Sequence, residues 1–115
     1  MVEVGWFSDL LKETLSGVGF FADYVQLHFN LNPLLNIYTP IDVTTDGLTR
    51  STGEPEFANA LLGLMHKQVA RVTIEAKRSI SIHFKDASIL SFASGCQEAF
   101  PESFTLFTSA GVFEE

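Results

Sequence analysis

The feature that most constrains the fold is a repeated alternation of apolar and polar residues. When the sequence is shifted by 55 residues against itself, residues 25–29 (Val-Gln-Leu-His-Phe) align with residues 80–84 (Ile-Ser-Ile-His-Phe), and residues 34–37 align with residues 89–92. Alternation with a period of two is typical of strands that bury one face. Because a lone hairpin cannot bury its apolar face, the repeat predicts two stacked copies of one strand-containing unit.

The spacing of apolar residues predicts two short helices. Residues 8–15 begin with a serine suited to the N-cap and carry leucines at helical spacing, and residues 55–65 carry a proline in the first turn and an apolar stripe. Strands are expected at residues 23–30, 34–39, 68–76, 79–84 and 89–93, and residues 41–44 are a candidate for a further short one. A last strand is expected near the C-terminus, where residues 103–108 alternate before the closing Val112-Phe113, whereas the polar residues 45–53 are typical of a loop.

The expected fold class is therefore α+β. It is a single domain over residues 1–115, with two short helices and six to seven mostly antiparallel strands in a curved sheet or partly open barrel. The domain is built from two similar helix-plus-strands halves, at approximately residues 8–44 and 55–94.

Charge and composition narrow the kinds of partner. The 115 residues include 14 acidic and 7 basic side chains, which give a formal net charge of -7. A negative surface repels nucleic acid and anionic membranes, so neither is expected as a partner, and a basic protein surface is favoured. The first residues lack a signal-peptide pattern and no apolar run is long enough to cross a bilayer, so we expect a cytoplasmic protein, as a monomer or homodimer.

The acidic residues are unevenly distributed. Residues 1–66 hold eight acidic and two basic side chains, whereas residues 67–91 hold five basic and two acidic ones. Asp42, Asp46, Glu54 and Glu56 lie close together in the sequence, and we predict that they form an acidic patch that docks on a basic partner.

His28 and His83 occupy equivalent places in the two repeats, on the polar side of their strands. They are candidate polar contacts for a small ligand, and a metal site would need a third ligand such as Asp23, Glu75 or Asp86, which the spacing does not demand. Cys96 stands alone, and a nucleophilic role would require a histidine brought to it by the fold. We therefore assign no catalytic residue, no metal and no cofactor.

The two modules read x-Val/Ile-x-Leu/Ile-x-Phe, a turn, and then Leu-x-Ile/Phe, and the second module runs from Ser79 through the Lys85-Asp86-Ala87-Ser88 turn to Leu90. In this respect the chain resembles an uncharacterised family of small bacterial proteins that includes suspected toxin-immunity proteins. The resemblance implies a β-rich fold and a protein-binding role, and it carries over no catalytic residue.

The expected function is that of a non-enzymatic binding protein, most concretely an immunity protein that occludes a basic toxin domain. The alternative is a small-ligand binding or sensing module that uses a cavity in the curved sheet. Most of the eleven Phe residues should fill the core, although the dense pairs, such as Phe20-Phe21, are candidates for exposure at an interface.

Overall fold

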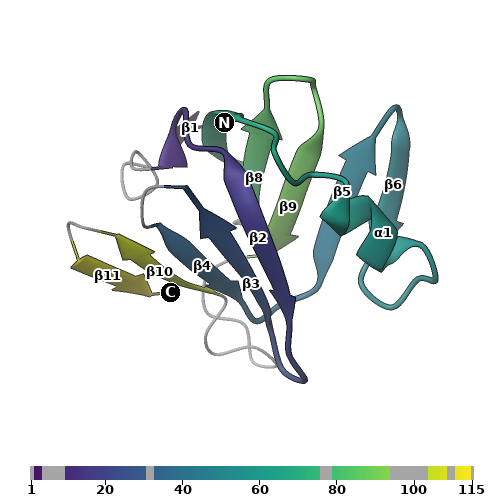
Figure 1. Cartoon of the computed structure of the whole chain (residues 1–115), viewed down its shortest axis with the longest axis horizontal. Helices are drawn as coiled ribbons and strands as arrows, with labels where there is room; N and C mark the ends of the chain where they lie inside the picture. The colour runs from purple at the N-terminus through teal and green to yellow at the C-terminus, as the bar shows by residue number, and fades with distance from the viewer. Residues whose placement is uncertain are drawn as a thin grey trace.

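The computed structural model describes residues 2–3, 10–30, 33–75, 79–93, 104–108 and 111–114. Within these residues the chain forms eleven strands and one helix (Figure 1). The elements are β1 (Val2–Glu3), β2 (Leu15–Phe20), β3 (Val25–Phe29), β4 (Leu34–Ile37), β5 (Ile41–Thr45), β6 (Leu48–Ser51), α1 (Phe57–Leu62), β7 (Val69–Glu75), β8 (Ser79–Phe84), β9 (Ile89–Ala93), β10 (Phe104–Thr108) and β11 (Gly111–Glu114). Ser8, the predicted N-cap, and Cys96 lie outside the described residues.

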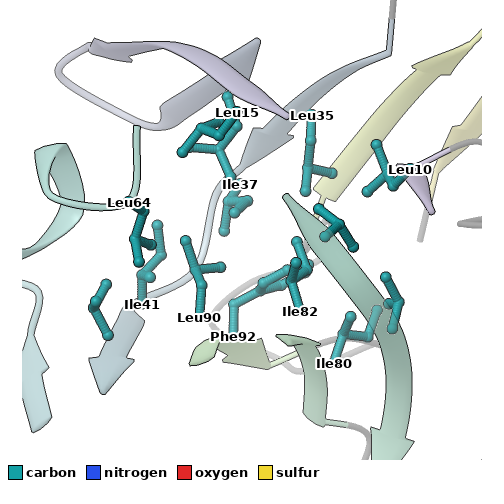
Figure 2. Close-up of a cluster of buried hydrophobic side chains, with 14 of the residues drawn as sticks. Leu10, Leu15, Leu35, Ile37, Ile41, Leu64, Ile80, Ile82, Leu90 and Phe92 are labelled. Carbon is teal, nitrogen blue, oxygen red and sulfur yellow. The ribbon is translucent and has the colours of Figure 1, made fainter. Parts of the chain in front are cut away.

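The strands form two antiparallel sheets. One sheet has the order β1-β7-β8-β9-β5-β6 and the other β11-β10-β4-β3-β2, with α1 packed against β5 and β6 (Figure 1). Figure 2 shows apolar side chains of β4, such as Leu35 and Ile37, pointing toward Ile82 of β8 and Leu90 of β9. These four side chains belong to one buried cluster, so the core lies between the two sheets.

The predicted α+β class is wrong, because the described residues form a mostly β structure of two sheets with a single short helix. The described part of the predicted helix at residues 8–15 is not an α-helix: Leu10 is in a 3₁₀ conformation, a turn follows, and Leu15 begins β2. Lys12 has a φ of 68°, which no right-handed helix allows, and Leu15 already pairs with Phe29 of β3. Leucine spacing alone was misleading, because Leu10 has a 3₁₀ conformation and Leu15 lies on a strand, and both are buried without an α-helix between them.

The second helix is present but shorter than the predicted residues 55–65. It buries Phe57 and Leu61 and ends before Gly63, and the side chain of its N-cap residue, Glu56, makes no capping hydrogen bond to the helix backbone. An uncapped helix of this length depends on packing for its stability, and α1 packs against the hairpin of β5 and β6.

The polar residues 45–53, predicted as a loop, contain strand β6. Asp46 and Gly47 have φ values of 52° and 80°, and the flanking Thr45 and Leu48 pair directly. Two central residues with positive φ define the tight hairpin turn whose twist matches that of the strands. The Asp-Gly signal therefore marks the turn of a hairpin inside this segment.

Alternation along the expected strands places Leu27, Phe29, Val72, Ile82 and Phe84 on inward faces, and all five are buried. The same alternation places Ala70 of β7 inward, but Ala70 is exposed. A bulge between Val69 and Arg71 explains the difference, because the extra residue lets both Val69 and Val72 face the core.

Two three-stranded meanders, β2-β3-β4 and β7-β8-β9, share one pairing scheme. Each first strand carries its bulge at the same place, between Leu15 and Gly17 in β2 and between Val69 and Arg71 in β7. The partners in the second hairpin are Val25–Ile37, Gln26–Asn36, Leu27–Leu35 and His28–Leu34 in one meander and Ile80–Phe92, Ser81–Ser91, Ile82–Leu90 and His83–Ile89 in the other. The 55-residue offset seen in the sequence is thus the offset between equivalent paired positions.

The two meanders meet at an antiparallel bridge between Thr14 and Gln68, which precede the first strand of each. The backbone hydrogen bonds around it form two equivalent pairs. In the first pair, Lys12 N donates to Val69 O and His66 N donates to Leu15 O. In the second, Val69 N donates to Glu13 O and Leu15 N donates to Lys67 O. Lys12 and His66 also share a positive φ, 68° and 73°. This pattern defines a pseudo-twofold axis through the Thr14–Gln68 bridge.

Each meander is completed by a hairpin from the other half of the chain. Strand β5 follows β4 in the sequence but pairs with β9, through Ile41 opposite Phe92. Strand β10 instead pairs with β4, through Phe104 opposite Ile37. The hairpins β5-β6 and β10-β11 are therefore exchanged between the two sheets.

Candidate functional site

The four predicted partner-binding residues lie on one hairpin and the segment after it. Asp42 is on β5, Asp46 is in the β5-β6 turn, and Glu54 and Glu56 lie between β6 and α1; all four side chains are exposed. The four residues are close together in the sequence, and the tight hairpin keeps such sequence neighbours close in space.

Ser51 brings two of the carboxylates together. Its hydroxyl donates to Asp42 Oδ1 at 2.5 Å, and its backbone N–H donates to Glu54 Oε1 at 2.6 Å. Ser51 is also the strand partner of Asp42, so both side chains project from the same face of the hairpin. The two carboxylates are held in place beside one serine, a link that sequence spacing alone does not reveal.

Glu56 lies on a different part of this surface. Its carboxylate accepts a hydrogen bond from Asn59 Nδ2 at 3.3 Å, and it lines a shallow pocket of about 260 Å³ together with Leu48 and Arg50. Arg50 pairs with the buried Val43, so its side chain starts from the face opposite to Asp42. The predicted patch is therefore divided: Asp42 and Glu54 are linked on one face, and Glu56 lies beside a cation at the α1 side.

The two candidate ligand-binding histidines lie on different sheets. His28 of β3 is exposed and shares a 2.6 Å hydrogen bond with Gln26 Oε1, and His83 of β8 is half-buried with its Nε2 3.1 Å from Thr73 Oγ1. Each histidine thus bonds within its own sheet, and neither lines the pockets described here.

Asp86, considered as a further metal ligand, instead belongs to an ion pair. Lys67 Nζ lies 2.6 Å from Asp86 Oδ2 and donates to Ser88 Oγ at 3.0 Å, while Ser88 N donates to Asp86 Oδ1 at 2.9 Å. The lysine and the Ser88 N–H lower the pKa of Asp86 from 3.8 to about 2. Among the described residues, no three His, Cys, Asp or Glu side chains are grouped so that they could hold a metal ion.

This ion pair predicts a small acid-sensitive contribution to stability. Because the pKa of folded Asp86 is below its usual value, the contribution is present above about pH 4 and is lost as the pH falls toward 2. We expect Asp86→Asn to lower the free energy of unfolding by about 1 kcal/mol or less at pH 6, since Asp86 is half exposed to solvent. Urea denaturation at pH 6 and pH 2.5 measures the effect, with Asp46→Asn as the control; a deficit that is the same at both pH values would contradict the assignment.

A second hollow was not predicted from the sequence. A groove of about 230 Å³ lies between the β2-β3 turn, the segment after β4 and the start of β5, and Phe21, Tyr24 and Tyr38 are among the residues that line it. The exposed pair Phe20-Phe21 was the available signal, and both side chains are about half exposed, at 48% and 51%. The sequence could not show that Tyr38 lines the same groove as Phe21, because Tyr38 lies in the segment after β4, distant from Phe21 in the sequence.

Comparisons with protein-family models, curated proteins and solved structures found no match to this chain. In the part of the chain that the structure describes, no helix has the length and apolar character needed to cross a membrane.

Proposed function

We propose that this chain is a non-enzymatic binding protein that docks on a basic protein through the outer face of the β5-β6 hairpin, in the manner of an immunity protein that occludes a toxin domain. The observation that carries the proposal is the pair of exposed carboxylates, Asp42 and Glu54, held by Ser51. Fixed charges lose less conformational entropy on binding than free side chains do, so they suit electrostatic recognition.

The surrounding charges support this choice of surface. Asp46 adds a negative charge at the turn of the same hairpin, while the half-buried Arg50 lies on the opposite side, where it lines a pocket with Glu56. A basic partner approaching Asp42 and Glu54 therefore meets a locally acidic surface, and opposite charge accelerates and orients association. A ligand site built from His28 and His83 has less support, because these side chains lie on different sheets.

The test uses amide substitutions that remove charge and keep the hydrogen-bonding oxygen. We expect Asp42→Asn with Glu54→Gln to slow association with a purified partner by about tenfold at low salt and to weaken its salt dependence. The partner is isolated by affinity purification with the tagged chain from cells that encode it. Surface plasmon resonance then measures the rate at which the purified partner associates with each variant at several salt concentrations.

The matched control changes the net charge equally at other surfaces. Asn30→Lys with Ala70→Lys raises the net charge by the same two units, at exposed positions outside the β5-β6 hairpin, and should change the association rate far less. Equal effects of the two double variants would show that only net charge matters, and a partner that binds both variants like the wild type would refute this surface.

A further inference from the structure

The aromatic groove beside the acidic hairpin has a wall of three rings. Phe21 and Tyr24 are stacked with ring centroids 4.7 Å apart and an interplanar angle of 13°, and Tyr24 meets the edge of Tyr38 at 5.7 Å and 61°. Aromatic faces carry partial negative charge and attract cations. Because Phe21 is about half exposed, this wall is open to a partner.

The rings are held from several directions. The Phe21 N–H donates to Tyr24 O at 3.0 Å, and the Tyr38 hydroxyl lies 2.9 Å from Thr105 Oγ1 of β10. Gly19 leaves room for the wall, because a Cβ at this position would lie 2.9 Å from Cε2 of Phe21. The rings are thus positioned by the β2-β3 turn and by a neighbouring strand before any ligand arrives.

The charge of the groove is negative. Among the described residues that line it, Asp23 alone is charged, and its side chain is exposed at the β2-β3 turn. Ile41 and Thr52 also line the groove, and in the sequence Ile41 directly precedes Asp42 and Thr52 directly follows Ser51. An aromatic wall with a carboxylate at its side is complementary to a cation on an apolar stem.

We propose that this groove binds the guanidinium group of an arginine side chain on the basic partner, which rests on the proposed function above. A guanidinium is planar, stacks on aromatic rings and pairs with a carboxylate through two parallel hydrogen bonds, whereas a lysine ammonium does neither. The arginine would lie against Phe21 and Tyr24 with its charge toward Asp23, next to the Asp42 and Glu54 pair. Buried arginine and aromatic contacts commonly anchor protein interfaces.

The first experiment measures the groove by itself. Nα-acetyl-arginine methylamide is titrated into the full chain while the ring resonances of Phe21, Tyr24 and Tyr38 are followed by NMR, and the citrulline analogue serves as the uncharged probe. We expect saturable shifts with the arginine compound, with a dissociation constant on the order of 1–10 mM, and no saturation with citrulline. Equal shifts with both probes would overturn the proposal. A dissociation constant below about 0.1 mM would overturn the assignment of the occupant as an arginine side chain of the partner and would favour a free arginine derivative instead.

Variants then identify the groups that bind. We expect Asp23→Asn and Phe21→Leu each to weaken binding of the arginine probe by about three- to tenfold, because one removes the carboxylate and the other a ring. Glu56→Gln, an acidic residue outside the groove, should leave the titration unchanged. Unaltered binding in both groove variants would overturn the assignment.

Partner binding separates this proposal from the proposed function. If the partner loses affinity for Asp42→Asn with Glu54→Gln but not for Asp23→Asn, the groove proposal fails and the acidic surface stands. If the arginine probe binds the groove while the partner ignores Asp42 and Glu54, the proposed docking surface fails and the arginine site stands.

Discussion

Replacement of Ile82 by alanine is expected to lower the free energy of unfolding by about 2 to 5 kcal/mol, the usual cost of emptying a packed core position. Ile82 is fully buried at the centre of β8, where it pairs with Val72 on one side and Leu90 on the other. Leu27 holds the equivalent position in β3, between Val18 and Leu35, and is also fully buried. Leu27→Ala should therefore cause a loss of similar size.

Urea denaturation followed by circular dichroism measures both losses, and Leu48→Ala is the control. Leu48 is 59% exposed at the end of the β5-β6 turn, so its truncation should change stability by about 0.5 kcal/mol or less. An Ile82→Ala variant as stable as the wild type would contradict the position of the core. A large loss for Ile82→Ala with none for Leu27→Ala would show that the equivalent positions are not equally packed.

Phe104→Ala should be the most damaging of the aromatic substitutions, at about 3 to 5 kcal/mol. Phe104 is fully buried on β10, and its ring meets Phe92 of β9 edge-on, with centroids 5.8 Å apart at 67°. The two strands belong to different sheets, so this contact joins the exchanged hairpin to the opposite sheet. Loss of the ring leaves a cavity and removes a favourable edge-to-face pair.

Phe107, on the same strand, provides the matched control. Its side chain is 36% exposed, so Phe107→Ala removes the same atoms from a site where water already reaches the ring. We expect a thermal unfolding midpoint close to that of the wild type for Phe107→Ala and a drop of several degrees for Phe104→Ala. Equal drops for the two variants would indicate that strand formation, and not burial between the sheets, sets the stability of β10.

The strands that alternate clearly could be predicted from the sequence, and those that do not were missed. β3, β8 and β9 carry period-two patterns and were placed within one or two residues of their observed bounds. β2 contains Ser16, Gly17 and Gly19, which have little intrinsic preference for strands, and it is held by pairing with β3 and with residues 66–67. The first helix was wrong for the same reason, since leucine spacing does not report such long-range pairing.

The candidate site could be predicted only where it is local in sequence. Asp42 and Glu54 could be proposed as neighbours because they are close in the sequence. The hydrogen bonds of both to Ser51, and the position of Arg50 on the face opposite to Asp42, depend on strand register. The aromatic groove depends on contacts between Tyr24 and Tyr38, which no periodic pattern encodes. Register and pairing between distant strands were therefore the missing information.

The exchange of hairpins makes the two halves dependent on each other. Without the second half, β4 would lose its neighbour β10, and β5 would have no β9 to join. The protomers of a domain-swapped dimer depend on each other in the same way. Here one polypeptide contains both halves, so each half meets the other at high effective concentration. Covalent fusion also frees the two copies to differ, and they do at the equivalent strand positions Asp42 and Thr105. Within the described residues, a nearly symmetric scaffold thus carries the linked carboxylates proposed for docking, Asp42 and Glu54, on one of its two exchanged hairpins.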